Sequence, residues 1–248
     1  MMTRTLAILL STAALATAQQ KISIPLSEPS QPATLLVRLT GGSLKIDVGP
    51  DPAVIVESAG AEAPAAPRPA PGGMHRLDSA GLHVEEDRNI VTVRTPDSGD
   101  QPNVTIRVPV NTSMELRSTN AAHIDVTGVN GDLDIQTLNG AVTLTGVTGP
   151  VVARSLSGNL TVSRSRTEPD VPLSLFSLTG NIDVTLPADT KASFRISTRS
   201  GSMLSDFDLE SATSRADSVA RHVEGTINGG GPDYVFETTS GNILIHRK

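Results

Sequence analysis

Four aspartates are the residues whose type and spacing come closest to a chemical site: Asp125, Asp132, Asp134 and Asp183. Asp132 and Asp134 are one residue apart, so in a strand both carboxylates project from one face. Carboxylates in such rows could bind Ca²⁺, which prefers oxygen ligands, or serve as the acid pair of a sugar-cleaving enzyme. The alternative is a solvated acidic face that discourages edge-to-edge aggregation. We favour this alternative, because nothing else marks a coordinated cluster and sugar-stacking aromatic residues are almost absent.

Other residue types with chemical potential form no recognisable site. The glycine-rich run 228–233 lacks the spacing of calcium-binding repeats and the lysine of a nucleotide loop, and it predicts a turn. The five histidines are scattered without metal-ligand spacing, no serine lies in a Gly-x-Ser-x-Gly motif, and there is no cysteine. We therefore assign no catalytic, cofactor-binding or metal-binding residue and expect a protein that is not an enzyme. The histidines are His75, His83, His123, His222 and His246.

The stretch 206–224 mixes acidic, basic and small polar residues within the repetitive part of the chain. Binding residues often lie on loops held by a rigid scaffold, so this stretch is a candidate recognition loop. The alternative is an inserted surface loop or a short helix without a binding role.

The first 18 residues have the pattern of an export signal. A positively charged start is followed by an apolar run over 6–16 and by Ala16-Thr17-Ala18, which predicts cleavage before Gln19. The apolar run is shorter than the ~20 residues that span a bilayer, so we expect no membrane anchor here. The prediction is an exported protein, periplasmic or extracellular, that is not an integral membrane protein.

The composition indicates a narrow aliphatic core. The chain has no Trp, one Tyr and four Phe, so its apolar content is mostly Val, Leu, Ile and Ala. Rows of stacked aliphatic side chains can fill such a core without large rings. The formal net charge of −6 is spread along the chain, which argues against nucleic acid as a partner.

The chain divides into four parts. Residues 1–18 form the signal peptide, and alternating apolar and polar residues over 19–58 predict an N-terminal β segment. Prolines and alanines over 59–75 predict a loop. Residues 76–248 are predicted to form a repetitive β-solenoid, adhesin-like domain.

Short units with a glycine turn recur in the last part of the chain. The units at 138–144, 156–162, 178–184 and 239–245 share a small polar residue, a glycine, a residue that is usually polar and then a triplet that is usually apolar–polar–apolar. The glycines at 140, 158, 180 and 201 lie 18, 22 and 21 residues apart. Stacked parallel coils, ~4.8 Å apart, would let each unit bury its apolar residues against its neighbours.

These units predict an all-β fold, a β-solenoid or single-stranded β-helix-like stack of short strands. The alternative is an antiparallel β-sandwich, because the Asn-Gly pairs at 130–131 and 139–140 are favoured in two-residue hairpins. The long, nearly constant spacing favours the solenoid.

A second repeat leads to a family resemblance. Residues 108–117 (VPVNTSMELR) match 186–195 (LPADTKASFR), and each precedes a glycine-type turn. Together with the Ser/Thr-Gly-Asn-Ile units, these turns make residues 82–248 resemble the bacterial putative-adhesin family of exported β-repeat domains. The departures are the insert at 59–73 and Ala121-Ala122, where a glycine turn is expected. The resemblance implies a solenoid-like fold and a location in the cell envelope.

Three functions fit these features. The first is a non-enzymatic, adhesin-like binding module that presents a repetitive β-surface to an unknown protein or glycan of the cell envelope or exterior. The second is a structural or accessory periplasmic protein linked to envelope signalling. The third is a polysaccharide-active β-helix enzyme, which would require carboxylates clustered with basic residues on adjacent coils.

Overall fold

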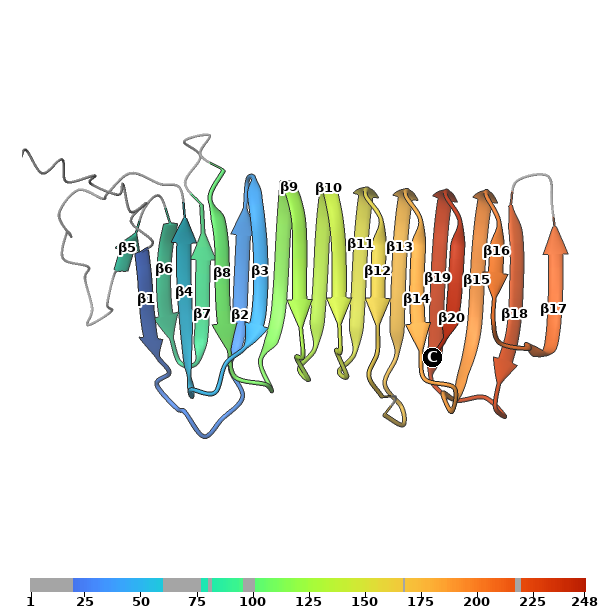
Figure 1. Cartoon of the computed structure of the whole chain (residues 1–248), viewed down its shortest axis with the longest axis horizontal. Coiled ribbons are helices and arrows are strands. Elements are labelled where there is room, and N and C mark those ends of the chain that lie inside the picture. Colours follow the sequence, from blue (N-terminus) through green and yellow to red (C-terminus); the bar gives the residue numbers. More distant parts are fainter. Residues whose placement is uncertain (1–19, 60–76, 80–81, 96–100, 167, 217–219) are drawn as a thin grey trace, which may run out of the picture.

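The computed structural model is a stack of strands whose long axis runs perpendicular to the strands (Figure 1). It describes residues 20–59, 77–79, 82–95, 101–166, 168–216 and 220–248, and all regular elements in these ranges are strands. No helix in the described part of the chain is long and apolar enough to cross a membrane.

The strands, in chain order, are β1 (Gln20–Pro25), β2 (Thr34–Leu39), β3 (Gly42–Val48), β4 (Ala53–Ala59), β5 (Leu77–Ser79), β6 (Leu82–Asp87), β7 (Ile90–Arg94), β8 (Asn103–Val108), β9 (Ser113–Thr127), β10 (Leu133–Thr145), β11 (Val151–Ser157), β12 (Leu160–Ser163), β13 (Leu173–Thr179), β14 (Ile182–Leu186), β15 (Ala192–Ser200), β16 (Met203–Ser205), β17 (Glu210–Ala216), β18 (Arg221–Ile227), β19 (Asp233–Ser240) and β20 (Ile243–Arg247).

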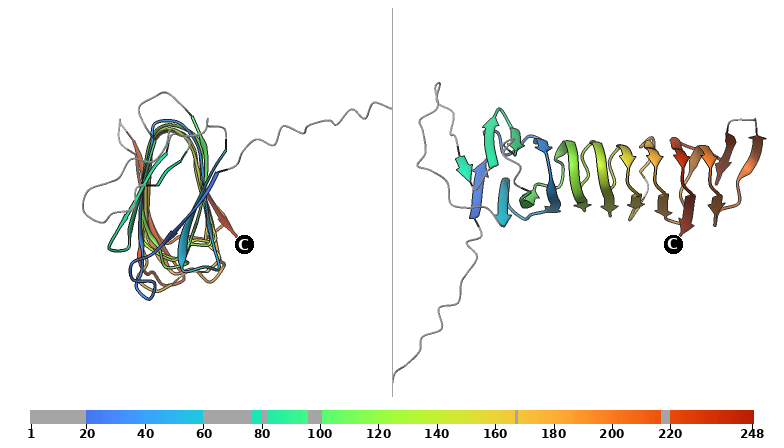
Figure 2. Two further views of the ribbon diagram at one scale, coloured as in Figure 1. Left: turned by 90° about the vertical axis from the view of Figure 1, so that its left-hand side faces the viewer. Right: turned by 90° about the horizontal axis from the view of Figure 1, so that it is seen from above.

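Each central coil runs up one side of the stack, turns a corner and runs down the other side. We call the side formed by β7, β2, the first half of β9, the first half of β10, β11, β13, β19 and β15 face A. Face B consists of β8, β3, the second halves of β9 and β10, β12, β14, β20 and β16. Neighbouring coils pair in parallel, and the view along the axis shows a flattened ring (Figure 2). The predicted β-solenoid is confirmed, and the antiparallel sandwich is wrong for the central coils.

The order of the coils in space differs from their order in the chain at both ends. The C-terminal coil, β19 and β20, pairs with β13 and β14 on one side and with β15 and β16 on the other. Near the N-terminus, β2 and β3 lie between the β7–β8 coil and β9. The β2–β3 coil and the β19–β20 coil are thus each inserted into the stack and held by a neighbouring coil on both sides.

Antiparallel strands close the stack. β4 pairs with β8 and β1, β6 pairs with β7 and β5, and at the other end β18 pairs with β15 and β17. The last coil of a parallel stack exposes backbone groups that could pair with another coil. A strand that runs in the opposite direction covers this edge, which ends the repeat and limits edge-to-edge aggregation.

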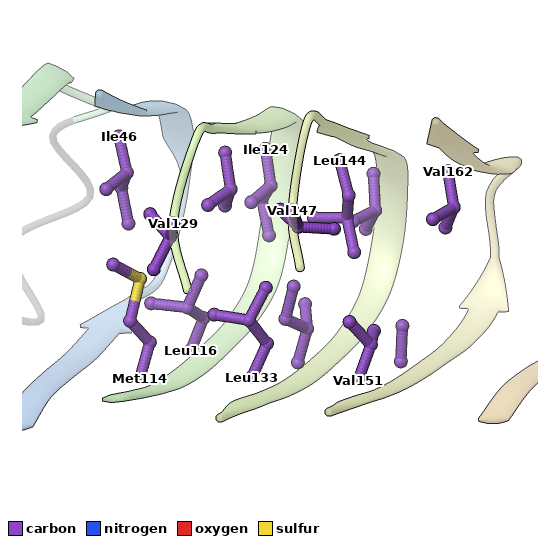
Figure 3. Packing of buried hydrophobic residues seen from close by; sticks show 14 of the residues in the cluster. Ile46, Met114, Leu116, Ile124, Val129, Leu133, Leu144, Val147, Val151 and Val162 are labelled. Carbon is purple, nitrogen blue, oxygen red and sulfur yellow. The ribbon is translucent and has the colours of Figure 1, made fainter. Parts of the chain in front are cut away.

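The core is a row of aliphatic side chains between the two faces. Leu116, Leu133 and Val151 point inward from face A, and Ile124 and Leu144 meet them from face B (Figure 3). Each fully buried side chain of this kind contributes roughly 1.5–3 kcal/mol, so several per coil stabilise the stack without large rings. This agrees with the narrow core that the composition predicts.

Glycines and asparagines form ladders at the corner between the two faces. A Cβ atom on Gly158 would lie 2.0 Å from the carbonyl oxygen of Gly140, and one on Gly180 would lie 2.1 Å from that of Gly158. The Asn159 side chain accepts a hydrogen bond from the Asn181 backbone (2.9 Å) in the next coil. The repeated glycine therefore serves the close approach of stacked backbones, and the asparagine joins consecutive corners.

The two matching proline turns have the same hydrogen bonds. The hydroxyl of Thr112 donates to the carbonyl of Pro109 (2.7 Å), and the hydroxyl of Thr190 donates to that of Pro187 (2.7 Å). Both threonines are buried, so the hydroxyl satisfies a turn carbonyl at the point where a new coil begins.

Ala121 and Ala122 lie within β9, where the sequence departs from the glycine turn. The register between β9 and β10 shifts here, from Asn139 opposite Asn120 to Ala141 opposite His123. Two residues of β9 therefore span the place that Gly140 alone takes in β10, which is the geometry of a bulge.

One charged side chain among the described residues is fully buried. Arg164 is 0% exposed, and its Nη2 donates to the carbonyls of Gly149 (3.0 Å) and Pro172 (3.2 Å). Its guanidinium lies 5.5 Å from the centre of the Tyr234 ring, and burial lowers the pKa of Arg164. The arginine thus ties two loop carbonyls to the ring of the wedged C-terminal coil.

The predicted boundaries between the parts remain predictions. The signal peptide at 1–18 and residues 60–75 of the predicted loop lie outside the described residues. The pairing of β3 with β8 and β9 joins strands from both sides of that loop into one sheet. The stretch 206–224 contains β17 and the start of β18, which form an antiparallel hairpin instead of the loop or short helix that the sequence suggested.

Glu86 gives the N-terminal end of the stack a pH-dependent contact. Its carboxylate accepts hydrogen bonds from the hydroxyl (2.8 Å) and backbone (3.1 Å) of Ser27 and from the backbone of Asn89 (3.0 Å). Burial alone raises the pKa of Glu86, but these hydrogen bonds outweigh it, and the net shift is downward. Because the folded-state pKa is lowered, the contact stabilises the fold above the ordinary pKa and is lost as the pH falls through the lowered one.

We expect Glu86→Gln to lower the free energy of unfolding by about 1 kcal/mol at neutral pH, because a charge-assisted acceptor is lost. The difference should vanish in acid, where the wild-type carboxyl is protonated as well. Urea unfolding at several pH values measures it, with Glu85→Gln on the exposed side of the same strand as the control. An equal loss at all pH values would contradict this role for the carboxylate charge.

Candidate binding surface

Four arginines form a row along face A. Arg38 of β2 lies in register with Arg94 of β7 on one side and with Arg117 of β9 on the other. Arg117 lies opposite Gln136 of β10, which lies opposite Arg154 of β11. We call these five residues the arginine row; at ~4.8 Å per coil it extends over about 19 Å.

The local sequence explains why these side chains point outward. Each arginine follows an apolar–x–apolar triplet, as in 35–38, 91–94, 114–117 and 151–154. The two apolar residues enter the core, so the alternation of a strand directs the arginine to the outer surface. The parallel register then aligns the four arginines, although they come from separate parts of the chain.

A second row, of leucines, runs beside the first. Leu138, Leu156 and Leu178 occupy matching positions of β10, β11 and β13, two residues beyond the arginine row. They are 47%, 47% and 46% exposed, whereas the other outward positions of these strands are mostly polar. We call these three residues the leucine column; contiguous apolar side chains at the surface commonly mark an interaction site.

The arginine row and the first two leucines line an open groove of about 710 Å³. Hydroxyl side chains also line it, among them Thr119 of β9 and Thr40, which directly follows β2. We call this feature the arginine groove. It offers guanidinium groups, hydroxyls and apolar surface in one place, and none of the described residues that line it is aromatic.

Acidic neighbours only partly balance the row. Glu115 pairs with Arg117 (2.6 Å), and Asp134 lies 3.9 Å from Arg154. Arg117 also donates a short hydrogen bond to Gln136. The guanidinium of Arg154 lies 5.4 Å from the centre of the Phe176 ring, which fixes it against the next coil.

Arg38 and Arg94 have no ion pair or side-chain hydrogen bond with any residue that the structure describes. Two adjacent cations without an acid repel each other, which a bound anion would relieve. A guanidinium is planar and binds carboxylate, sulfate or phosphate groups through paired hydrogen bonds. This end of the groove therefore carries positive charge in an arrangement suited to an anion, on a protein whose formal net charge is −6.

The structure separates the four aspartates. Asp134 lies on face A and Asp132 precedes its strand, whereas Asp125 and Asp183 lie on face B. Asp125 lies 2.8 Å from His123, and Asp183 lies 3.7 Å from His246. Among the described residues, no group of three or more histidine, aspartate or glutamate side chains could hold a metal ion.

The glycine-rich run and two of the remaining histidines belong to the described part of the chain. The run 228–233 forms the turn between β18 and β19, where Asn228 donates to the carbonyl of Thr190 (2.6 Å). His83 and His222 lie in β6 and β18, and His75 lies outside the described residues.

The arginine groove was not predicted from the sequence. Its signal is the recurrence of apolar–x–apolar–Arg at 35–38, 91–94, 114–117 and 151–154. The same pattern at 104–107 and 192–195 does not contribute to the row, so the signal becomes visible only when the strands are aligned as repeats. The glycine turns used for the repeat analysis mark only some of these strands, and they left the N-terminal coils unaligned.

The fold and the groove define a β-solenoid domain with a cationic groove along one face and antiparallel strands at both ends. Residues 118–246, just over half of the chain, match the family model described as Toastrack DUF4097, and the chain belongs to this family. The family resemblance inferred from 82–248 is thereby confirmed.

Two solved structures are similar to this chain. One is a putative cell adhesion protein from Clostridium sporogenes ATCC 15579, with a TM-score of 0.51 and 11% identity over 93% of this chain and 100% of that one. The other is a putative adhesin from Bacteroides fragilis NCTC 9343, with a TM-score of 0.43 and 11% identity over 93% of this chain and 98% of that one. The first likeness shows a shared fold, and the second carries no argument. A comparison with curated proteins gave no match.

Proposed function

We propose that this chain is an exported, non-enzymatic, adhesin-like binding module whose binding surface is the arginine groove. The observation that carries the proposal is that two adjacent arginines without an ion pair, Arg38 and Arg94, lie at one end of a groove that has exposed leucines at its other end. Exposed cations beside apolar surface suit a partner that supplies both anionic and apolar groups.

The scaffold supports the same proposal. The groove lies on paired strands whose inward side chains are fully buried, so its side chains start from fixed backbone positions. A rigid surface of this kind loses little conformational entropy on binding. The name of the first similar structure, a putative cell adhesion protein, agrees with a binding role in the cell envelope or outside the cell.

The first test is where the native protein resides and whether it binds there. We expect residues 19–248 at the cell surface, in the medium or in the periplasm, and saturable binding of the purified protein to isolated cell envelopes. The double variant Arg38→Glu/Arg94→Glu should weaken envelope binding at least about tenfold, since two groove cations become anions. Lys191→Glu/Arg199→Glu changes the net charge equally at the far end of the stack and is the control.

A cytoplasmic location, or envelope binding that the groove variant leaves unchanged, would contradict the proposal. Binding that falls equally in both double variants would show an effect of net charge alone, and it too would count against the groove.

A further inference from the structure

The arginine groove has two chemically different ends. Arg94, Arg38 and Arg117 occupy three consecutive coils at one end, and Leu138 and Leu156 occupy the two coils at the other. Residues of the arginine row and of the leucine column lie two positions apart along each strand, which separates the two rows by ~7 Å. A partner must therefore present anionic groups along one line and apolar groups along a second, parallel line.

We propose, as an extension of the proposed function, that the groove binds an acidic amphipathic α-helix of another protein. The pitch of an α-helix is ~5.4 Å, close to the ~4.8 Å between coils, so side chains on successive turns can meet successive coils. Carboxylates at i, i+4, i+7 and i+11 lie on one stripe of such a helix, and positions i+1, i+5 and i+8 form a stripe beside it.

The contacts that the structure offers fit such a helix better than they fit other partners. Bidentate pairing with carboxylates would neutralise Arg38 and Arg94, which form no ion pair with any described residue. Apolar side chains of the helix would cover Leu138 and Leu156, each 47% exposed. An anionic polysaccharide would use the arginines but leave the leucines without an apolar partner.

The groove also excludes binding by strand addition. Its floor consists of strands that already pair on both sides, as β9 does with β2 and β10, so no backbone group is free to pair with an added strand. Recognition must therefore occur through side chains. A helix, whose own backbone hydrogen bonds are internal, is suited to this.

The test uses full-length mature protein and a synthetic 18-residue helical peptide. The peptide carries a glutamate stripe along its length and, beside it, leucines confined to one half. Fluorescence anisotropy measures its Kd, with a scrambled peptide of the same composition, heparin and phosphatidylglycerol vesicles as alternative probes. We expect the helical peptide to bind at least about tenfold more tightly than the scrambled one, and its affinity to fall with added salt.

The variants separate the two rows. Arg38→Glu/Arg94→Glu should weaken peptide binding at least about thirtyfold, and Leu138→Ser/Leu156→Ser should weaken it about tenfold. The matched controls are Lys191→Glu/Arg199→Glu for charge and Leu204→Ser, on face B, for apolar exposure; both should leave the Kd unchanged. All substituted side chains are exposed or at the surface, so unfolding curves should overlay with the wild type.

Three results would overturn the proposal. One is equal affinity for the scrambled peptide, another is peptide binding that the leucine variant does not change, and the third is groove-dependent binding of heparin or vesicles in place of the peptide. If the peptide does not bind while envelope binding still depends on Arg38 and Arg94, this inference fails and the proposed function stands. If envelope binding is also independent of the groove, both fail.

Discussion

Replacing Gly180 by alanine is expected to lower the free energy of unfolding by about 3 kcal/mol, among the largest effects of any single methyl group in this chain. The new Cβ would lie 2.1 Å from the carbonyl oxygen and 2.7 Å from the carbonyl carbon of Gly158. Both atoms are backbone, so no side-chain rotation relieves the contact and the coils must separate. The neighbouring coil is affected as well, because Gly241 approaches the carbonyl of Gly180 in the same way.

Gly229→Ala separates this effect from ordinary glycine strain. Gly229 has a positive φ of 84°, but a Cβ there would meet no atom within 4 Å. The free energy of unfolding of this control should therefore fall only by the cost of a left-handed conformation at alanine, about 1–2 kcal/mol. Urea unfolding of both variants decides: if Gly180→Ala costs no more than Gly229→Ala, the stacked glycines have no steric role.

The repeat units of the sequence predicted much of the fold because the residues within each unit determine its local structure. Gly158 and Gly180 mark corners, and the triplets after them supply the inward and outward positions of a strand. Parallel stacking followed from the spacing. These features depend on residues close together in the chain, which is why the sequence alone could predict them.

The order of the coils could not be predicted in this way. The unit at 239–245 resembles the unit at 178–184, and nothing in either specifies its neighbours. The spacing of glycines suggested that the corner of Gly201 follows that of Gly180, but Gly241 lies between them. After β16 the chain forms the antiparallel hairpin of β17 and β18 and then turns back. The last coil, β19 and β20, therefore lies between the β13–β14 coil and the β15–β16 coil.

Strand alternation and residue type give conflicting predictions at Arg164. Leu160 and Val162 point inward, and the same alternation places Arg164 inward, whereas its charge predicts an outward side chain. Two loop carbonyls and the face of Tyr234 compensate part of the cost of burial. Such compensation depends on the fold, which explains why composition and periodicity do not reveal it.

The arginine groove shows the same limit for function. Arg38 and Arg94 are far apart in the sequence, and four other strands, β3 to β6, lie between β2 and β7 along the chain. Each arginine alone is an ordinary outward residue of a strand. Only the pairing of strands converts separate residues into a row, and which distant strands become neighbours is not visible in the sequence of either strand.

The C-terminal coil, β19 and β20, packs between two other coils through buried aromatic side chains. Phe236 of β19 is 0% exposed, and its ring centre lies 5.8 Å from that of Phe194 and 6.3 Å from that of Tyr234. Phe236→Ala should lower the free energy of unfolding by about 3–5 kcal/mol, because it removes a buried ring and leaves a cavity. We also expect faster proteolysis within 233–248, since β19 loses packing against the coils on both sides.

Phe176→Ala is the matched control, because Phe176 lies on the outer surface of β13, opposite Glu237. It should cost less than about 1 kcal/mol, since its ring packs mainly against the guanidinium of Arg154. Urea unfolding and limited proteolysis of the two variants compare an inner ring with an outer ring on adjacent strands. Equal losses would show that the aromatic cluster does not hold the C-terminal coil in place, and the pairing of β19 with β13 and β15 would then have to do so through backbone hydrogen bonds alone.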